Sequence, residues 1–582
     1  VNDVPHIGHA YTTIAADVLA RYHRLRGREV FSLTGVDEHG QKVQQAAAKA
    51  GIDPQAYCDR LAPQFRQLWQ RLNISNDAFI RTTDKQHQEI VQRYLRQLFD
   101  SKLIYSDDYT GWYCTFDERF WTEKDVVDGL CPDCKRPVEQ LSERNYFFKM
   151  GQYQDRLIAH IEAHPDFVRP ESRRNEVLGF LKTQKLGDLS ISRPKSRLSW
   201  GIELPFDPDY VTYVWFDALV NYISALEYLT SKPALDRFWP ADVHLVGKDI
   251  LTTHAVYWST ILMALGLDLP KTIFAHGWWT VDGEKMSKSR GNVVDPNAMV
   301  DRFGTDAFRY FLLREVPFGH DGDFSQEALV GRINSDLANG LGNLLSRTLT
   351  LIERYRGGRV PAPGKERASD RNLQQATVDL LNTILPEHFS KLEFNRSLES
   401  IWQVVQIGNQ YVDSMKPWNL AKSSADGDQL NTVLYHLAET LRILGQAIYP
   451  FMPQTAEELS AQLGVTVSTS HSPLKEPISW GGLKPGTPIQ KGRVLFPRIE
   501  QNKPVGAKPV SDSPTPAAST TPSTATAATT AAAPQAPAQI TIDEFMKIQL
   551  KTAKVLTAER VPRSEKLIKL QVDLGSEQRQ IV

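Results

Sequence analysis

The sequence predicts an α/β protein in which a parallel-sheet domain is interrupted by an insertion and followed by a helical region. Near the start of the chain, apolar residues recur at helical spacing over residues 6–26. Gly27 and an apolar, strand-like run at residues 30–34 follow, which completes half of a parallel α/β unit. Beyond residue 325, apolar residues recur at helical spacing, which is typical of a helix bundle.

A second α/β region extends from about residue 210 to residue 275. It contains two strand-like runs, at residues 243–247 and 272–275. The stretch between the two α/β regions carries three of the four cysteines and lacks the α/β pattern. We therefore expect this stretch to be an inserted domain.

Two helical faces and a change of composition divide the second half of the chain. Apolar residues share one face over residues 398–412 and again over residues 434–448, before Pro450 ends the run. Residues 501–538 are mostly Ala, Thr, Pro and Ser without aromatics, which predicts a disordered linker. Residues 540–582 regain the alternation of apolar and polar residues that is typical of a small β-rich domain.

Composition indicates a globular protein large enough for several hydrophobic cores. The 582 residues are 41% hydrophobic and 23% charged, and no apolar run is long enough to cross a bilayer. With a formal net charge of −1, any nucleic-acid binding must use local basic patches. Four cysteines in so long a chain argue against a disulfide framework. The chain starts at Val1 without a methionine and ends at Val582 inside a strand-like run, so we expect native sequence beyond both ends and leave a targeting peptide open.

Pro5-His6-Ile7-Gly8-His9 lies where a strand should lead into the first helix. The free backbone N–H groups and the dipole of a helix N-terminus attract phosphate. His6 and His9 face the same way from the first turn, and Gly8 lets a phosphate or a flat ring approach the backbone. Taken alone, such a segment is more often two surface histidines at the start of a helix.

Lys285-Met286-Ser287-Lys288-Ser289, the KMSKS loop, follows a turn signal at Asp282-Gly283. Two lysines and two hydroxyls in a mobile loop can clamp a polyphosphate. Taken alone, the loop is more often a solvated basic segment.

In this order, and separated by α/β sequence with one insertion, the two segments resemble the signature motifs of the class I aminoacyl-tRNA synthetases. The resemblance implies a Rossmann-type catalytic domain with an inserted connective domain, and the binding of ATP with Mg²⁺ assumed. By resemblance, Asp249 contacts the ATP ribose. The ATP-binding residues that the resemblance implies are His6, Gly8, His9, Asp249, Lys285, Ser287 and Lys288. The residues to which it assigns catalysis are His6, His9, Lys285 and Lys288.

Three further segments, residues 34–40, 214–222 and 247–254, resemble the methionine-specific members of this family, the methionyl-tRNA synthetases. By resemblance, Asp37 holds the substrate ammonium. The residues that the resemblance places around the methionine thioether are Trp215, Ala218, Tyr222, Ile250 and His254. Aromatic and aliphatic walls suit this flexible, polarizable side chain. Taken singly, Trp215 and Tyr222 are at least as often ordinary core residues.

Cys114 with Asp117, and Cys131 with Cys134, form two pairs with the spacing of metal ligands. Such pairs make tetrahedral zinc sites, and zinc accepts a carboxylate oxygen among thiolates. The resemblance places a zinc knuckle in the insertion, and we expect one Zn²⁺ per chain. Asp117 stands where a cysteine is commoner in the family, and the alternative is a set of reduced free thiols. Cys58 is expected to be a small core residue.

Asn343 and Arg347 share one helix face, and Trp418 follows Lys416-Pro417 at the start of a helix. By resemblance, these three residues read the CAU anticodon. Trp418 would supply a stacking surface, while Asn343 and Arg347 would read base edges. Without the upstream motifs, a surface pair and a structural tryptophan would be the simpler interpretation.

Residues 540–582 resemble the start of the OB-fold tRNA-binding domain that some family members carry. This copy looks truncated. In relatives the domain dimerises, so a homodimer is expected. The residues that give the segment local positive charge are Lys547, Lys551, Lys554, Arg560 and Arg563.

The whole resemblance implies a cytoplasmic enzyme with no membrane partner. It would convert L-methionine and ATP into methionyl-adenylate and load methionine onto tRNA(Met), including initiator tRNA, for translation initiation and elongation. The reaction needs no covalent enzyme intermediate, so catalysis is positioning and charge stabilisation. One alternative is another class I synthetase, of which the cysteine enzyme is nearest in size but carries zinc in its amino-acid pocket. The other is a non-catalytic tRNA-binding or scaffold protein, against which the intact motif histidines and lysines argue.

The resemblance also implies the domain boundaries. We expect a catalytic domain in two halves, at residues 1–101 and 213–278, with a connective insertion that carries a zinc knuckle between them at residues 102–212. The KMSKS loop with a stem-contact region follows at residues 279–325, and a helical anticodon-binding domain at residues 326–465. The last parts are a C-terminal extension of the core (466–500), the linker (501–538) and a partial OB-fold (539–582).

Overall fold

The computed structural model describes residues 3–115, 119–121, 123, 125–126, 128–132, 134–230, 234–281, 283–286, 292–469, 473–500, 554–560, 568–573 and 577–581. The chain divides into two compact units, Val1–Lys503 and Pro504–Val582, and each is described by itself. The predicted linker at residues 501–538 lies outside the described residues.

The α/β pattern predicted near the start of the chain is confirmed. Helix α1 (Ile7–Leu25) is followed by β1 (Leu33–Val36), which pairs in parallel with β2 (Ala78–Arg81) over its whole length. β1 begins later than the predicted strand at residues 30–34, because the parallel ladder starts only where β2 supplies a partner. The remaining helices of this part are α2 (Gln41–Ala50), α3 (Pro54–Arg71) and α4 (Lys85–Asp100).

A second parallel sheet has the strand order β11-β12-β6. β11 (His244–Gly247) and β12 (Ile273–His276) agree with the predicted strands. β6 (Val168–Arg169) has no counterpart in the sequence prediction, since two residues are too few to show a period. The helical elements beside this sheet are α7 (Val214–Tyr228), α8 (Leu235–Phe238), η2 (Lys248–Ile250), the π-helical η3 (Thr253–Trp258) and α9 (Ser259–Leu265).

The stretch predicted as an insertion consists mainly of antiparallel strands. β3 (Ile104–Cys114) and β5 (Glu139–Phe148) form a long antiparallel pair. They are flanked by β4 (Arg119–Trp121) and β7 (Leu189–Ser190). A smaller sheet consists of β8 (Ser192–Pro194), β10 (Asp207–Thr212) and β9 (Glu203–Leu204). The helices of this stretch are η1 (Met150–Tyr153), α5 (Gln154–Ala163) and α6 (Glu171–Thr183).

The predicted helix bundle is confirmed beyond a short connecting region. The connecting elements are β13 (Trp279–Val281), β14 (Glu284–Lys285), α10 (Pro296–Phe303), α11 (Thr305–Arg314) and β15 (Gly322–Asp323). The elements of the bundle are α12 (Gln326–Arg332), η5 (Ile333–Gly342), α13 (Asn343–Arg356), α14 (Ala368–Asp379), η6 (Leu380–Ile384), α15 (Leu385–Ser390), α16 (Phe394–Met415), α17 (Pro417–Leu420), η7 (Ser424–Asp426), α18 (Gly427–Ile448) and α19 (Pro453–Gln462).

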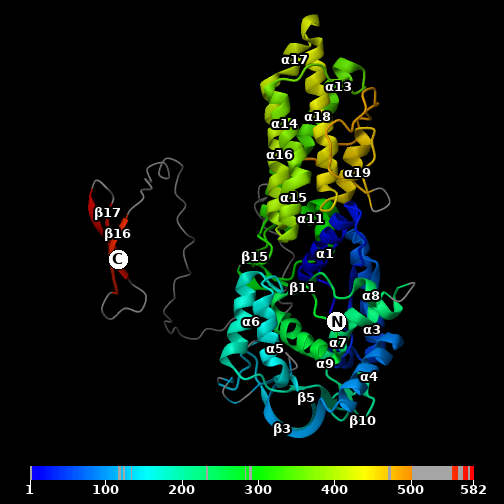
Figure 1. Ribbon diagram of the computed structural model, residues 1–582, viewed down its shortest axis with the longest axis vertical. Helices are drawn as coiled ribbons and strands as arrows, with labels where there is room; N and C mark the ends of the chain where they lie inside the picture. The colour runs from blue at the N-terminus through cyan, green and yellow to red at the C-terminus, as the bar shows by residue number, and fades with distance from the viewer. Residues whose placement is uncertain are drawn as a thin grey trace, which may run out of the picture. The chain divides into compact units, whose positions relative to one another are not determined.

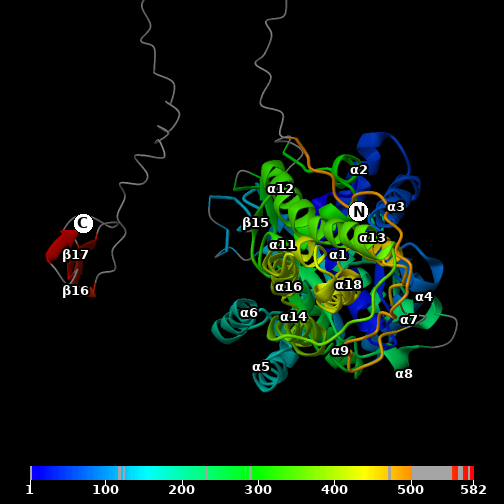
Figure 2. The ribbon, with the colours of Figure 1, turned by 90° about the horizontal axis from the view of Figure 1, so that it is seen from above.

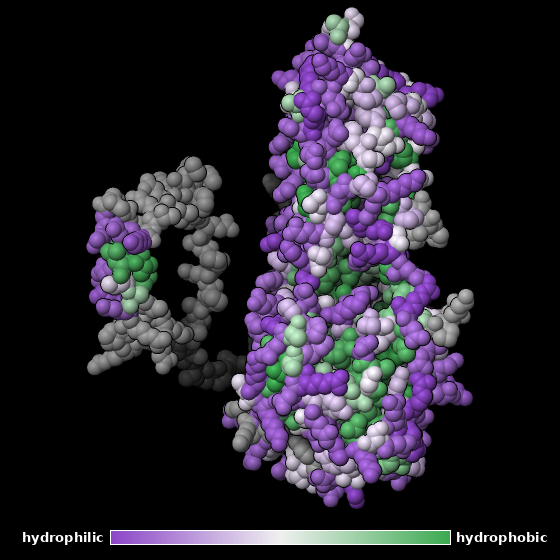
Figure 3. Space-filling view, viewed as in Figure 1, coloured by the Kyte–Doolittle hydropathy of each residue, from purple (hydrophilic) through white to green (hydrophobic). Residues whose placement is uncertain are grey.

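The long helices and the antiparallel sheet lie at opposite ends of the first unit. In Figure 1, α14, α16 and α18 run side by side above α1 and α11, while β3 and β5 lie at the lower end. Figure 2 looks along these helices and shows them grouped together. On the face shown in Figure 3, hydrophilic residues cover most of this unit, and apolar ones are visible between them. Within the described residues, no helix combines the length and the apolar character that crossing a membrane requires.

A buried ion cluster joins α1 to the helical region. Asp17 Oδ2 lies 2.9 Å from Arg21 Nε and 2.6 Å from a terminal nitrogen of Arg309 on α11. Arg309 also donates to the carbonyl oxygens of Leu72, Pro450 and Phe451 at 2.8–3.0 Å. Burial by itself would raise the pKa of Asp17, but the two arginines outweigh it and hold this pKa below its ordinary value. The ion pair with Arg309 on α11 therefore fixes how α1 is rotated about its axis and how deeply it is buried.

The second unit contains three described strands. β16 (Lys554–Arg560), β17 (Ile568–Asp573) and β18 (Gln578–Ile581) form an antiparallel sheet in this order. β17 lies within residues 540–582, where the alternation of apolar and polar residues predicted a β-rich domain, and Val572 on it is buried.

Replacing Arg309 by methionine should destabilise the first unit strongly. The change leaves Asp17 buried with Arg21 as the remaining cation of the cluster, and breaking a buried pair in this way costs about 3–5 kcal/mol. The matched control is Lys85→Met, which removes an exposed pair with Glu89 and should cost less than about 1 kcal/mol. Urea unfolding followed by circular dichroism measures both variants. Equal shifts of the two midpoints would contradict the importance of the buried cluster.

Candidate functional site

His6 caps the N-terminus of α1, so the first predicted motif is a well-formed helix start. His6 Nδ1 accepts a hydrogen bond from the Gly8 backbone N–H at 3.0 Å, and His9 Nδ1 accepts one from the His6 N–H at 3.2 Å. The centroids of the two imidazole rings are 4.0 Å apart. A Cβ on Gly8 would lie 2.9 Å from His6 Cε1, so a glycine is needed for the ring to fold back. Two imidazoles and a helix N-terminus thus converge where a phosphate can bind.

The second turn of α1 is attached directly to the end of the second parallel sheet. The Thr12 hydroxyl lies 2.6 Å from Nε2 of His276, the last residue of β12. His276 Nδ1 donates to the Gly277 carbonyl oxygen at 2.7 Å, so Nε2 is left as an acceptor. Burial and the neighbouring His6 lower the pKa of His9 from 6.5 to about 3, which keeps its ring uncharged at neutral pH.

Asp249 lies at the same end of this sheet. Gly247 on β11 pairs with His276 on β12, and Asp249 follows it in η2. Ligands bind at the carboxyl ends of the strands in open α/β sheets. The Asp249 side chain is exposed, and its Oδ1 accepts a hydrogen bond from Trp278 Nε1 at 3.0 Å. Asp249, the residue predicted to bind the ATP ribose, therefore lies at the same edge of the sheet as the start of α1.

Asp37 follows β1 directly and so occupies the equivalent end of the first sheet. Its side chain keeps an exposed surface. Crowding by surrounding protein and the nearby negative charge of Asp217 raise the pKa of Asp37. A cationic group that binds at Asp37 would relieve this repulsion, which suits an ammonium ligand.

A chain of hydrogen bonds joins Tyr222 on α7 to η2. His254 Nδ1 lies 2.9 Å from the carbonyl oxygen of Ile250, which can only accept, so this nitrogen carries the proton. His254 Nε2 therefore accepts the hydroxyl proton of Tyr222 at 2.7 Å. Burial lowers the pKa of His254 from 6.5 to about 4 and, together with Asp37, raises that of Tyr222. Both side chains are uncharged at neutral pH.

The other predicted methionine-pocket residues lie in the same region. Trp215 and Ile250 are half-buried and pack, with Tyr222, against one apolar cluster of the α/β part. Ala218 is 3% exposed and lies one helical turn before Tyr222 on α7. Hydrogen bonds thus connect Tyr222, His254 and Ile250, and Trp215 and Ala218 precede Tyr222 on the same helix.

A buried polar network behind this pocket was not predicted. Asp217 accepts from His39 Nδ1 at 2.6 Å and from His87 Nε2 at 2.8 Å, and His87 Nδ1 lies 2.7 Å from the Ser224 hydroxyl. Burial would raise the pKa of Asp217, but the two histidines hold it below its ordinary value. His39 and Asp217 belong to the segments at residues 34–40 and 214–222, whereas nothing in the sequence singles out His87 on α4.

His244 is a second polar residue that sequence reasoning missed. Its ring stacks on Tyr222 with centroids 4.1 Å apart, and burial followed by the nearby His254 lowers its pKa to about 3. The aromatic layer of Tyr222, His244 and His254 is therefore neutral, and the acidic groups of this region are Asp37 and Asp217.

Three of the four predicted metal ligands converge at the end of β3. The Sγ atoms of Cys114, Cys131 and Cys134 all lie within 4.8 Å of one another, and those of Cys114 and Cys134 are 3.4 Å apart. This separation is far longer than a disulfide bond, and none of the four cysteines forms one. Three converging sulfurs form a donor set that suits zinc. Asp117, the fourth predicted ligand, lies outside the described residues.

The KMSKS loop is only partly described. Glu284 and Lys285 form β14, which pairs with β13 so that Lys285 lies opposite Thr280. The side chain of Lys285, and all of Ser287 and Lys288, lie outside the described residues.

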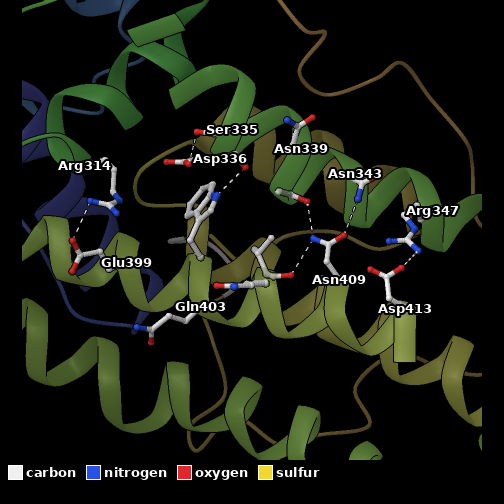
Figure 4. A pocket seen from close by; sticks show the side chains of 14 residues that line it. Arg314, Ser335, Asp336, Asn339, Asn343, Arg347, Glu399, Gln403, Asn409 and Asp413 are labelled. Atoms are coloured by element: carbon white, nitrogen blue, oxygen red, sulfur yellow. Dashed lines mark hydrogen bonds and ion pairs between the residues drawn. The ribbon is translucent and has the colours of Figure 1, made fainter. Parts of the chain in front are cut away.

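Asn343 and Arg347 line a groove of about 520 Å³ between α13 and α16. Figure 4 shows both side chains facing residues of α16. Asn343 Nδ2 donates to Asn409 Oδ1 at 2.9 Å, and Arg347 forms an ion pair of 2.5 Å with Asp413. Asn409 and Asp413 were not predicted, because their relation to Asn343 and Arg347 depends on the packing of two helices. The groove therefore holds its amide and guanidinium groups in defined orientations.

Trp418 lies on the short helix α17, which begins just after α16 ends. Its side chain is 38% exposed, so the indole is not part of the hydrophobic core. An exposed aromatic face is what stacking of an unpaired base requires.

Family models match the chain over nearly its whole length. A model described as tRNA synthetases class I (M) matches residues 1–142 and 137–349. A model of the anticodon binding domain of methionyl tRNA ligase matches residues 360–506. A model of a putative tRNA binding domain matches residues 550–582.

Relatives and solved structures agree with these models. The chain is 49% identical over 582 residues to the methionine–tRNA ligase of Caldanaerobacter subterraneus subsp. tengcongensis, covering 100% of this chain and 88% of that protein. It is 45% identical to the methionine–tRNA ligase of Thermotoga maritima, with the same coverage. Methionyl-tRNA synthetase of Mycobacterium tuberculosis in complex with methionyl-adenylate has a TM-score of 0.81 at 44% identity, covering 85% of this chain and 97% of that one. The free form of that synthetase has a TM-score of 0.73 at 39% identity, covering 86% and 96%.

The stability of the first unit should fall as the pH drops from about 6.5 towards 4. The pKa of His254 is near 4 in the folded chain and near 6.5 when unfolded, so the unfolded state binds more protons in this window. One such histidine contributes about 1.4 kcal/mol per pH unit. His254→Gln should flatten the dependence by this amount, measured as urea midpoints between pH 7 and 5. Identical slopes for the variant and the parent would show that His254 is not held neutral.

Proposed function

Because this chain belongs to the methionyl-tRNA synthetases, a family of class I aminoacyl-tRNA synthetases, we propose roles for its residues in the two steps of that reaction. The enzyme activates L-methionine with ATP to methionyl-adenylate and then transfers methionine to tRNA. Because the chain belongs to the methionine-specific family, it is not the cysteine-specific class I synthetase. The observation that carries the proposed roles is the meeting of the α1 N-terminus, Asp249 and Gly247 at one end of the β11–β12 pair.

Methionine binds with its ammonium on Asp37 and its side chain against Trp215, Ala218, Tyr222, Ile250 and His254. The raised pKa of Asp37 supports this role, because an arriving ammonium offsets the repulsion from Asp217. The neutral pair of Tyr222 and His254 gives the thioether a wall without charge. Such a pocket separates side chains that differ by one methylene by about 1–3 kcal/mol.

ATP binds across the start of α1. Gly8 and the helix N-terminus receive phosphate, with His6 and His9 beside it, and Asp249 accepts from a ribose hydroxyl. The neutral state of His9 supports a role as a hydrogen-bond donor through its Nε2 rather than as a cation, because its Nδ1 already accepts from the His6 N–H. Lys285, Ser287 and Lys288 of the KMSKS loop hold the departing phosphates. Mg²⁺, bound with ATP, supplies further neutralisation of phosphate charge.

The methionine carboxylate attacks the α-phosphorus in line, and the bond to the pyrophosphate oxygen breaks. The chain contributes alignment of the two substrates and stabilisation of the charge that develops on the pyrophosphate, largely through Lys285 and Lys288. No side chain becomes covalently attached. A ribose hydroxyl at the 3′ end of tRNA then attacks the adenylate carbonyl and releases AMP.

One Zn²⁺ per chain binds at Cys114, Cys131 and Cys134, with Asp117 as the fourth ligand. The convergence of three sulfurs without a disulfide supports this assignment. The site lies in the β3–β5 region and stabilises the local fold.

The helical region reads the CAU anticodon through Asn343, Arg347 and Trp418. Asn409 already accepts from one N–H of Asn343, and Asp413 binds one end of Arg347, so both groups are oriented before RNA binds. Preorganisation of this kind lowers the cost of ordering side chains at an interface. The tRNA partners include initiator tRNA, so the enzyme serves translation initiation and elongation.

We also place the enzyme in the cytoplasm as a homodimer. Four cysteines without a disulfide suit a reducing compartment. Val555, Leu556 and Ile581 of the second unit expose 43–54% of their surface, which supports the covering of this small sheet by a second copy.

Trp418→Ala should impair aminoacylation of tRNA much more than methionine activation. The loss of one stacked base costs about 1–3 kcal/mol, so charging should fall about 10- to 100-fold. Methionine-dependent ATP–pyrophosphate exchange needs no anticodon contact and should stay near the parent value. The control is Trp480→Ala, a half-buried indole elsewhere in the first unit, which should not separate the two activities. Equal losses of exchange and charging in Trp418→Ala, with a lowered melting temperature, would make Trp418 a structural residue.

Purified enzyme should contain one zinc per chain by elemental analysis. Asp117→Ala should weaken retention of the metal against a chelator, because one of four ligands is lost. Cys58→Ala is the matched control, since this buried cysteine is not among the three that converge, and it should retain the metal fully. If protein without metal is fully active, the three cysteines are free thiols and not zinc ligands.

A further inference from the structure

Trp278 is held in place by two charged residues beside the proposed ribose site. The Lys248 ammonium lies 4.2 Å from the centroid of the Trp278 ring and 2.6 Å from Asp321 Oδ2. Asp321 Oδ1 accepts from the backbone N–H of Trp278 at 2.8 Å. A cation over the ring face and an anchored backbone fix the plane of the indole.

The backbone on either side leaves little freedom for this arrangement. A Cβ on Gly277, directly before Trp278, would lie 2.3 Å from the carbonyl carbon of His320. The two chain segments therefore approach too closely for any other residue, and the point at which Trp278 leaves the backbone is set. A Cβ on Gly247 would lie 2.5 Å from Asp249 Oδ1, so the Asp249 carboxylate folds back against bare backbone.

The indole N–H of Trp278 connects the fixed ring to the Asp249 carboxylate. Trp278 Nε1 donates to Asp249 Oδ1 at 3.0 Å. Asp249 is exposed on a short helical turn, where a carboxylate without such a donor samples several rotamers. A hydrogen bond to one oxygen fixes the carboxylate plane and leaves the second oxygen to accept from a ligand hydroxyl. Preorganisation of this kind raises the selectivity of a hydrogen-bonding site.

We propose that Trp278 is a positioning residue that orients Asp249 towards a ribose hydroxyl of ATP, with Lys248 and Asp321 holding the indole. The inference rests on the proposed contact between Asp249 and the ribose. It adds Trp278, which lies outside the signature motifs, and it explains why the Asp249 carboxylate has its orientation.

ATP–pyrophosphate exchange with ATP, 2′-deoxy-ATP and 3′-deoxy-ATP tests the proposal. The ratio of kcat/KM for ATP to that for each analogue measures how well the enzyme reads each hydroxyl, and the parent should discriminate against one analogue by about tenfold or more. Trp278→Phe retains a ring under Lys248 but has no N–H, so this discrimination should fall by about threefold or more while KM for methionine stays unchanged. Trp480→Phe, an indole distant in sequence and not in contact with Asp249, should retain full discrimination.

Two further variants separate the possible failures. Asp249→Ala should abolish the discrimination; if it does not, the proposed ribose contact is wrong and the inference fails with it. If Asp249→Ala abolishes the discrimination and Trp278→Phe retains it, the inference alone is overturned. Lys248→Gln removes the cation from the indole face and should lower the discrimination in the same direction. A folded Lys248→Gln variant with full discrimination would contradict the role of Lys248, so the proposal is testable even where Trp278→Phe does not fold.

Discussion

The buried carboxylate of Asp17 determines the position of the helix at whose start the proposed ATP site lies. It is sealed between Arg21 and Arg309, and Arg309 in turn binds carbonyl oxygens at residues 72, 450 and 451. A buried charge cannot lose its partners without a large cost, so α1 can neither rotate nor slide. The same helix carries His6 and His9 at one end and contacts β12 through Thr12. One rigid element thus connects the proposed phosphate-binding end of the α/β part to the helical region.

Around this element, charge is distributed unevenly over the proposed methionine pocket. The aromatic and imidazole groups are neutral, because burial lowers the pKa of His244 and His254 and raises that of Tyr222. The carboxyl groups of this region belong to Asp217, whose pKa His39 and His87 hold below its ordinary value, and to Asp37, which has the open surface. An amino acid with a cationic ammonium and an apolar side chain matches this division. The resemblance in sequence and the electrostatics therefore lead to the same substrate.

Short-range patterns in the sequence predicted α1, β11, β12 and the bundle, because helical period and strand length are local properties. The contacts that complete the site are not local. Asp17 meets Arg309 across 292 residues, and His87 reaches Asp217 from α4 across 130. Asn409 and Asp413 face Asn343 and Arg347 only because α13 and α16 pack together. β6 is too short for any period, and the hydrogen bond from Trp278 to Asp249 depends on a close approach of two backbone segments.

The most direct measurement is the methionine dependence of ATP–pyrophosphate exchange in Asp37→Asn. The central claim is that methionine is recognised by one open carboxylate at the end of β1 above a neutral pocket. Loss of this charge should raise KM for methionine at least about tenfold and leave KM for ATP nearly unchanged. Asp59→Asn, which alters an exposed carboxylate on α3, should behave as the parent. An unchanged KM for methionine in Asp37→Asn would contradict the account.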